Sequence, residues 1–194
     1  RFTLFPYPTL FRSLAVVILF GLHALAQDMG WPPLDNSPMD MSYFPINYPL
    51  LKINKEAGGP LVMSVIYSRP QKKDREVFGG LLEYGEVWRL GANEATEIEF
   101  YRDVKIEGNK VKKGKYSMYA IPYENKWTII LNKETDTWGA FAYDPKKDIL
   151  RVDVKTEKNP VPVEVFSMVF TKTSTGANLM MTWDSVKAYL PISF

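Results

Sequence analysis

The sequence contains no cysteine and a single histidine, His23, among its 194 residues. Without cysteine the chain cannot form disulfides, thiolate metal sites, haem-attachment motifs or a cysteine nucleophile. One histidine leaves little room for a histidine-ligated metal or a Ser-His-Asp triad. We therefore expect no metal site and no cofactor, and any catalysis would have to use carboxylates, lysine, tyrosine or serine.

The first 26 residues are not expected to belong to the fold. Residues 3–13 read TLFPYPTLFRS and match the translation of a common sequencing adapter, TLFPYTTLFRS, at ten of eleven positions, so we interpret residues 1–13 as an artefact. Residues 14–26 are an apolar run ending in Ala24-Leu25-Ala26, which is typical of a truncated secretory signal peptide. The run is shorter than the roughly 20 residues that a membrane span needs. We expect cleavage after Ala26 and a periplasmic or extracellular protein with no membrane span.

Removing these residues changes the charge of the chain. The whole sequence has 24 basic and 22 acidic residues and a formal charge of +2. The remaining 168 residues do not include Arg1, Arg12 or His23, so their formal net charge is zero and they contain no histidine. A neutral chain without an RNA-binding motif is not expected to bind nucleic acid.

The rest of the sequence lacks a sustained helical period, and at most a helical turn fits near 133–138. Residues 27–49 carry five prolines, which favours an extended arm. From there on, short segments with a period of two and many β-branched or aromatic residues recur between turn signals. The expected strands are 61–68, 86–90, 96–101, 104–107, 110–112, 115–121, 127–132, 148–155, 163–171, 177–183 and 186–192.

This pattern predicts an all-β fold, with residues 50–194 forming a single antiparallel β-sandwich or flattened barrel of about ten short strands behind the arm. Pro191 should place the last strand at an edge or a bulge. Lys110, Lys112, Lys113 and Lys115 should form a basic hairpin. Such a hairpin could bind phosphate or an acidic partner. Alternatively, it could be a solvated sheet edge whose lysines discourage strand-to-strand aggregation.

Several segments together carry a family resemblance. They are SRPQKKDREVFGG (68–80), EYGEVWRLGANEATEIEF (83–100), YAIP (119–122), KWTIILN (126–132) and WGAFAYDPKKDILRVDV (138–154). On these segments the chain resembles domain of unknown function 2911, an uncharacterised family of exported, mostly β proteins from Bacteroidetes-type bacteria. The final LPISF also looks like that family's native end. The resemblance implies no known reaction, ligand or catalytic residue.

The densest polar cluster lies within the WRLGANEAT run. Gly91-Ala92-Asn93 should form a tight turn, since glycine and asparagine tolerate positive φ. In a binding interpretation, Arg89 binds an anionic or hydroxyl group of a ligand. Asn93 and Glu94 form hydrogen bonds with the ligand, and Trp88 stacks on it. In a structural interpretation, Arg89 and Glu94 form a buried ion pair, Asn93 closes the turn and Trp88 fills the core.

A second cluster, 138–144, alternates small and aromatic residues. It suits a strand with Phe141 and Tyr143 on one face, and rings on an open sheet would make a platform for a sugar, with Asn132 and Asp144 binding hydroxyls. Alternatively, Trp138 and these two rings pack in the core, which a domain of this size needs.

These clusters support three hypotheses of different classes. The first is a non-catalytic binding module for a carbohydrate or another cell-envelope component, using Trp88, Arg89, Asn93, Glu94, Trp138 and Tyr143. The second is a glycan hydrolase with paired carboxylates, Glu86 with Glu94 or Glu83 with Glu94, which would have to stand about 5–10 Å apart. The third is a structural or assembly domain without a small ligand. The oligomeric state stays open at this stage.

Overall fold

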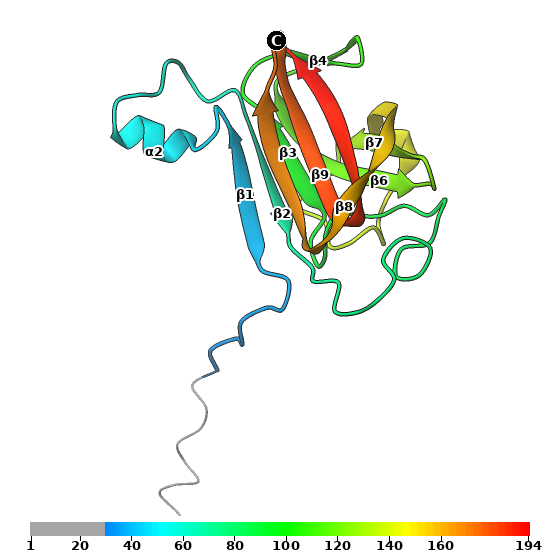
Figure 1. The fold of residues 1–194 in the computed structure, drawn as a ribbon. Coiled ribbons are helices and arrows are strands. Elements are labelled where there is room, and N and C mark those ends of the chain that lie inside the picture. Colours follow the sequence, from blue (N-terminus) through cyan, green and yellow to red (C-terminus); the bar gives the residue numbers. More distant parts are fainter. Residues whose placement is uncertain (1–29) are drawn as a thin grey trace, which may run out of the picture. The chain divides into compact units, whose positions relative to one another are not determined.

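The structure is a computed structural model that describes residues 30–194. The regions interpreted as a sequencing artefact (1–13) and a signal peptide (14–26) lie outside the described residues. Between Asn36 and Phe194 the chain forms one compact unit. Its secondary structure is almost entirely β, which confirms the predicted all-β class (Figure 1).

The described residues contain nine strands, which pair antiparallel in a single sheet in the order β1-β2-β3-β6-β7-β8-β9-β4-β5. The strands are β1 (Met39–Phe44), β2 (Met63–Ser68), β3 (Thr96–Phe100), β4 (Val104–Ile106), β5 (Asn109–Val111), β6 (Gly114–Pro122), β7 (Lys126–Asn132), β8 (Asp148–Lys172) and β9 (Gly176–Ser193). A helix, α2 (Tyr48–Ile53), follows β1, and a 3-10 helix, η1 (Pro145–Lys147), precedes β8.

The expectation of about ten short strands is wrong in one respect, because two of the strands are long. The predicted strands 148–155 and 163–171 are the two halves of β8, which has 25 residues, and 177–183 and 186–192 both belong to β9, which has 18. β8 pairs with β7 over its first half and with β9 over its second, and the pairing with β9 is irregular between Lys158 and Val163. Pro160 and Pro162 lie in that irregular stretch, where a missing N–H costs no regular ladder bond.

The predicted arm and helical turn also differ from the structure. Residues 39–44 of the arm form β1, which pairs along its whole length with β2. Helix α2 begins within the arm, with proline in its first turn, where the absent N–H is not needed for a helical hydrogen bond. No helix forms at 133–138.

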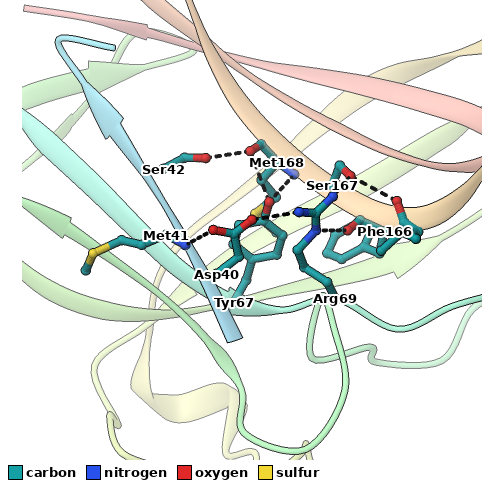
Figure 2. A network of polar contacts seen from close by, with 9 residues as sticks. Asp40, Met41, Ser42, Tyr67, Arg69, Phe166, Ser167 and Met168 are labelled. Carbon is teal, nitrogen blue, oxygen red and sulfur yellow. Dashed lines mark hydrogen bonds and ion pairs between the residues drawn. The ribbon is translucent and has the colours of Figure 1, made fainter. Parts of the chain in front are cut away.

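The sheet folds back on itself where β1 and β2 meet the second half of β8. Ser42 Oγ donates to the Met168 carbonyl at 2.6 Å, and the Tyr67 hydroxyl accepts from the Met168 N–H at 2.9 Å (Figure 2). Just beyond β2, Gln71 pairs with Val165 in an antiparallel bridge. One continuous sheet of nine strands thus brings β1 and β2 into contact with the second half of β8.

Arg69, the residue after β2, ties this junction together (Figure 2). Its Nη1 lies 2.8 Å from Asp40 Oδ2, its Nη2 donates to Ser167 Oγ at 2.9 Å and its Nε donates to the Phe166 carbonyl at 3.3 Å. One guanidinium thus bonds to both β1 and β8, using the several donors that arginine presents in a fixed geometry.

An aromatic cluster fills the core between the folded-back parts of the sheet. Trp88 stacks on Trp183 at a centroid distance of 6.0 Å and meets Trp127 and Phe166 edge-on at 5.6 and 5.0 Å. All four side chains are buried. Burying aromatic rings in these geometries supplies a large share of the stability of a domain of this size.

Candidate functional site

The WRLGANEAT run forms a loop that backbone and side-chain hydrogen bonds hold at both ends. At its start, Trp88 exchanges backbone hydrogen bonds of 2.7 and 2.8 Å with Ala120 of β6. At its end, the Thr96 N–H donates to the Arg89 carbonyl at 3.1 Å, and Thr96 Oγ1 donates to the Leu90 carbonyl at 2.6 Å. The predicted tight turn is confirmed, since Asn93 has a φ of 58°, and Leu90 also adopts a positive φ of 54°.

Gly91 allows this loop to pack against β2. A Cβ at position 91 would lie 2.9 Å from the Ser68 carbonyl oxygen, which is closer than real Cβ contacts come. The carbonyl of Gly91 accepts the indole N–H of Trp88 at 3.1 Å. The glycine therefore permits a close approach between the loop and the sheet, and the loop in turn satisfies the polar atom of a buried tryptophan.

Trp88 belongs to the core, with only 5% of its surface exposed. This location agrees with the structural interpretation, in which the Trp88 ring fills the core. The ring has almost no exposed surface that could contact a ligand.

Arg89 does not form the ion pair with Glu94 that the structural interpretation required. Within residues 30–194 no carboxylate lies within ion-pair distance of its guanidinium, and its buried Nε has no hydrogen-bond partner. Burial lowers the pKa of Arg89, although an arginine stays protonated at neutral pH. A half-buried cation without an anionic partner is unusual, because desolvation of a charge is costly unless a partner offsets it.

Two cavities adjoin Arg89. The first, of about 280 Å³, is also lined by Glu83 and Glu86, and the second, of about 260 Å³, is also lined by Arg75. Both share Leu81, Leu82, Trp88 and Arg89 in their walls. The guanidinium therefore stands where two adjoining cavities meet, with a second arginine nearby.

Glu94 and Trp138 are brought together by a short ladder between two loops. They face each other in an antiparallel bridge, flanked by hydrogen bonds from the Ala95 N–H to the Thr137 carbonyl at 3.0 Å and from the Gly139 N–H to the Asn93 carbonyl at 2.8 Å. Directly opposed residues of such a bridge point to the same face. Both side chains are exposed, Trp138 to 60%.

The expected strand across 138–144 is wrong, because turns replace it. Gly139 has a φ of 65°, which ends the extended conformation after Trp138. A Cβ at this position would lie 3.0 Å from the Phe141 ring and 3.8 Å from Arg89 Nη1, so residue 139 sits against both side chains. The Phe141 ring is 87% exposed, and it lies against residue 139, which also adjoins the Arg89 guanidinium.

Tyr143 lies in a separate polar network. Its hydroxyl donates to Asp148 Oδ2 at 2.7 Å and accepts from Arg151, whose Nε also donates to Asp148 Oδ2 at 2.7 Å. Burial, followed by the hydrogen bond to Asp148, raises the pKa of Tyr143 to about 12. The residue is half-buried and its hydroxyl is already used by protein groups, which favours a structural role.

The polar groups of Asn132 and Asp144 that were considered for binding sugar hydroxyls already form hydrogen bonds within the protein. Asn132 is buried, and its amide donates to the Asp144 carbonyl and to Asp148 Oδ1. The carboxylate of Asp144 accepts the Lys146 N–H at the start of η1.

The glutamates considered for a hydrolase do not converge on one cavity. Glu86 and Glu83 line the first cavity beside Arg89, whereas Glu94 lines another, of about 300 Å³, with Glu97 and Asp136. All three of the considered glutamates are exposed. The structure thus brings Arg89 together with Glu83, Glu86 and Gly139, whereas Glu94 lines a different cavity and shares a face of the short ladder with Trp138.

Arg75 was missed as a site residue, although it lies in the segment SRPQKKDREVFGG (68–80), one of those that carry the family resemblance. The loop that follows β2 supplies Pro70 and Arg75 to the second cavity. The Arg75 side chain is held by its own loop, with Nε donating to the Lys72 carbonyl and Nη2 to the Gln71 carbonyl. A run of basic residues in a long loop is the only sequence signal that could have indicated it.

Other features bear on the alternatives. Helix α2 buries none of its residues, and its Leu50 and Ile53 are 57% and 80% exposed, which is the kind of surface that an assembly domain would use. In the described part of the chain, no group of three or more metal-ligating side chains could hold an ion. Over the same residues, no helix has the length and apolarity that a transmembrane span requires.

Comparison with known proteins gives a single result. No curated protein and no solved structure matches the chain significantly. A family model does match, over residues 49–192, which is most of the chain and includes the WRLGANEAT loop, the 138–144 turns, β8 and all but the last residue of β9. The expected membership is therefore confirmed, and the chain belongs to the family described as "Protein of unknown function (DUF2911)".

Proposed function

We propose that this protein is an exported binding domain for a carbohydrate or related envelope component that carries a negatively charged group. The observation that carries the proposal is Arg89, a half-buried guanidinium at the meeting point of two cavities with no anionic partner in residues 30–194. A carboxylate, sulfate or phosphate on the ligand would complete the pairing that the protein itself leaves open.

Two exposed aromatic residues that flank Gly139 suit the rest of such a ligand. Trp138 and Phe141 are exposed on either side of Gly139, which abuts Arg89. An exposed aromatic ring can pack against the apolar C–H face of a sugar while polar groups bind its hydroxyls. Glu83 and Glu86 line the same cavity as Arg89 and are placed to accept hydrogen bonds from hydroxyls.

Binding to an oligosaccharide array tests this proposal. The array should contain uronate-bearing and neutral oligosaccharides of matched length, probed with the protein, Arg89→Met and a control, Lys133→Met. Lys133 is an exposed lysine that lines none of the cavities at Arg89, so the control removes one positive charge elsewhere.

We expect selective binding of acidic oligosaccharides, weakened at least tenfold in Arg89→Met and unchanged in Lys133→Met. A Trp138→Ala variant should weaken acidic and neutral saccharides alike, since it removes stacking area only. Absence of binding to every saccharide, or equal binding by Arg89→Met, would reject the proposal.

The hydrolase hypothesis has less support, because Glu94 lines a different cavity from Glu83 and Glu86. A reaction with paired carboxylates needs two acids on either side of one bond. The expected export rests on the sequence of residues 14–26 and is part of the same proposal.

A further inference from the structure

A second candidate site lies at the β4–β5 hairpin and shares no lining residue with the cavities at Arg89. It is a cavity of about 550 Å³ lined by Asp103, Lys105, Lys110, Lys112, Thr175 and Ser193, together with Val104 and Phe194. This volume falls in the range of small-molecule binding sites. Three of its lining residues are lysines: Lys105 lies in β4, Lys110 lies in β5, and Lys112 follows the end of β5.

The register of the strands places two of these lysines in one row. Lys105 of β4 pairs with Lys110 of β5 on one side and with Ser193 of β9 on the other. Directly opposed side chains of an antiparallel ladder share a face, with Cβ atoms about 4.5–5.5 Å apart. Ser193, Lys105 and Lys110 therefore stand side by side, and all three line the cavity.

This arrangement puts like charges directly opposite each other, which is destabilising in the absence of an anion. Lys112 is neutralised by Asp103, whose Oδ2 lies 2.8 Å from the Lys112 ammonium. Among the described residues, no carboxylate pairs with Lys105 or Lys110. The side chains that line the cavity thus have a net positive charge, which comes from Lys105 and Lys110.

We propose that this cavity binds a phosphate group, with Lys105 and Lys110 supplying the charge and Thr175 and Ser193 supplying hydroxyl donors. Lysine ammonium groups act as compact point charges and suit phosphate without requiring a planar, bidentate geometry. The phosphate could belong to a soluble molecule or to a lipid headgroup, which share this chemistry.

Calorimetric titration with pyrophosphate at low salt tests the site. The variants are Lys105→Gln/Lys110→Gln and the control Lys113→Gln/Lys133→Gln, which removes the same charge from exposed lysines outside the cavity. We expect saturable binding by the wild type and the control, and at least a tenfold loss in Lys105→Gln/Lys110→Gln. A parallel arm measures co-sedimentation of the same proteins with phosphatidylglycerol and phosphatidylcholine vesicles.

Each outcome decides the proposal. Pyrophosphate binding that depends on the two lysines supports a soluble phosphate ligand, whereas lysine-dependent sedimentation with phosphatidylglycerol alone supports a lipid headgroup. No binding in either arm, or an equal loss in the control, overturns the proposal. Removing the like charges should leave the unfolding midpoint of Lys105→Gln/Lys110→Gln no lower than that of the wild type, so lost binding would not reflect misfolding.

Discussion

Arg69 and Arg89 are both half-buried arginines, the first directly after β2 and the second in the loop that precedes β3, but their surroundings differ. Every nitrogen of the Arg69 guanidinium donates a hydrogen bond, and its carboxylate partner, Asp40, comes from β1. Arg89 has a buried Nε without a partner and faces two cavities. The first arginine joins parts of the sheet, whereas the second is held in place by its backbone and leaves its charge available.

The comparison shows that burial and residue type do not by themselves distinguish a structural cation from a binding cation. What distinguishes them is whether the fold supplies the anion. The same substitution at both positions, arginine to methionine, keeps most of the apolar stem and removes the charge, so it separates the two roles directly.

The largest effect is expected for Arg69→Met. The substitution leaves Asp40, Ser167 and the Phe166 carbonyl without their donor, so we expect a loss of about 1–2 kcal/mol in the free energy of unfolding, limited by partial exposure of the Arg69–Asp40 pair. Urea denaturation measures the loss. A double-mutant cycle with Asp40→Ala should show coupling between the two residues, and strictly additive effects would contradict the structural role.

A smaller effect, confined to alkaline pH, is expected for Tyr143→Phe. The pKa of Tyr143 is about 12 in the folded protein and near 10 in an unfolded chain. Its folded pKa is raised, so its contribution to stability is fully present below pH 10 and is lost as the pH rises from 10 to 12. Wild-type stability should therefore fall more steeply than that of Tyr143→Phe over this interval.

Urea denaturation of both proteins at pH 9 and pH 11 checks this prediction. The other tyrosines and the lysines titrate in both proteins, so the difference between the two slopes isolates Tyr143. Parallel slopes would contradict the prediction, because they would show that the pKa of Tyr143 is not raised in the folded protein.

The smallest effect on stability is expected for Arg89→Met. Because no residue in the described chain pairs with this charge, its removal should change the free energy of unfolding by less than about 0.5 kcal/mol, or raise it. Thermal and urea unfolding beside Arg69→Met provide the measurement. A loss comparable to that of Arg69→Met would mean that Arg89 is a structural cation after all.

Local patterns predicted much of the fold. Leu150, Val152 and Val154 alternate with exposed residues and are buried. The expected hairpin of strands 104–107 and 110–112 forms as β4 and β5, but its turn falls at Glu107-Gly108, one position earlier than expected, where both residues have positive φ. The length of β8 was not predictable, because the prolines near 160 interrupt the pattern while the chain itself stays extended. Alternation at 138–144 was misleading, since the positive φ of Gly139 turns the chain.

The site was predictable only in part, for a related reason. The sequence indicated the loop, Arg89 and the exposed Trp138, and it predicted the positive φ of Asn93. It could not show that Arg89 and Glu94 point to different cavities, because this depends on the ladder between residues 93–95 and 137–139. Nor could it reveal the cation–carboxylate contact between Arg69 and Asp40, which joins residues 29 positions apart.

The junction of β1 and β2 with β8 has a consequence for the order of events when the chain folds. Ser42 is made early in synthesis, yet its hydrogen-bond partner, Met168, follows 126 positions later. Phe166 and Trp183, which pack against Trp88 in the core, are likewise synthesised long after it. Because such distant contacts are slow to form, the domain cannot close until its last quarter is available, and the contacts of β1 with β8 cannot form before then.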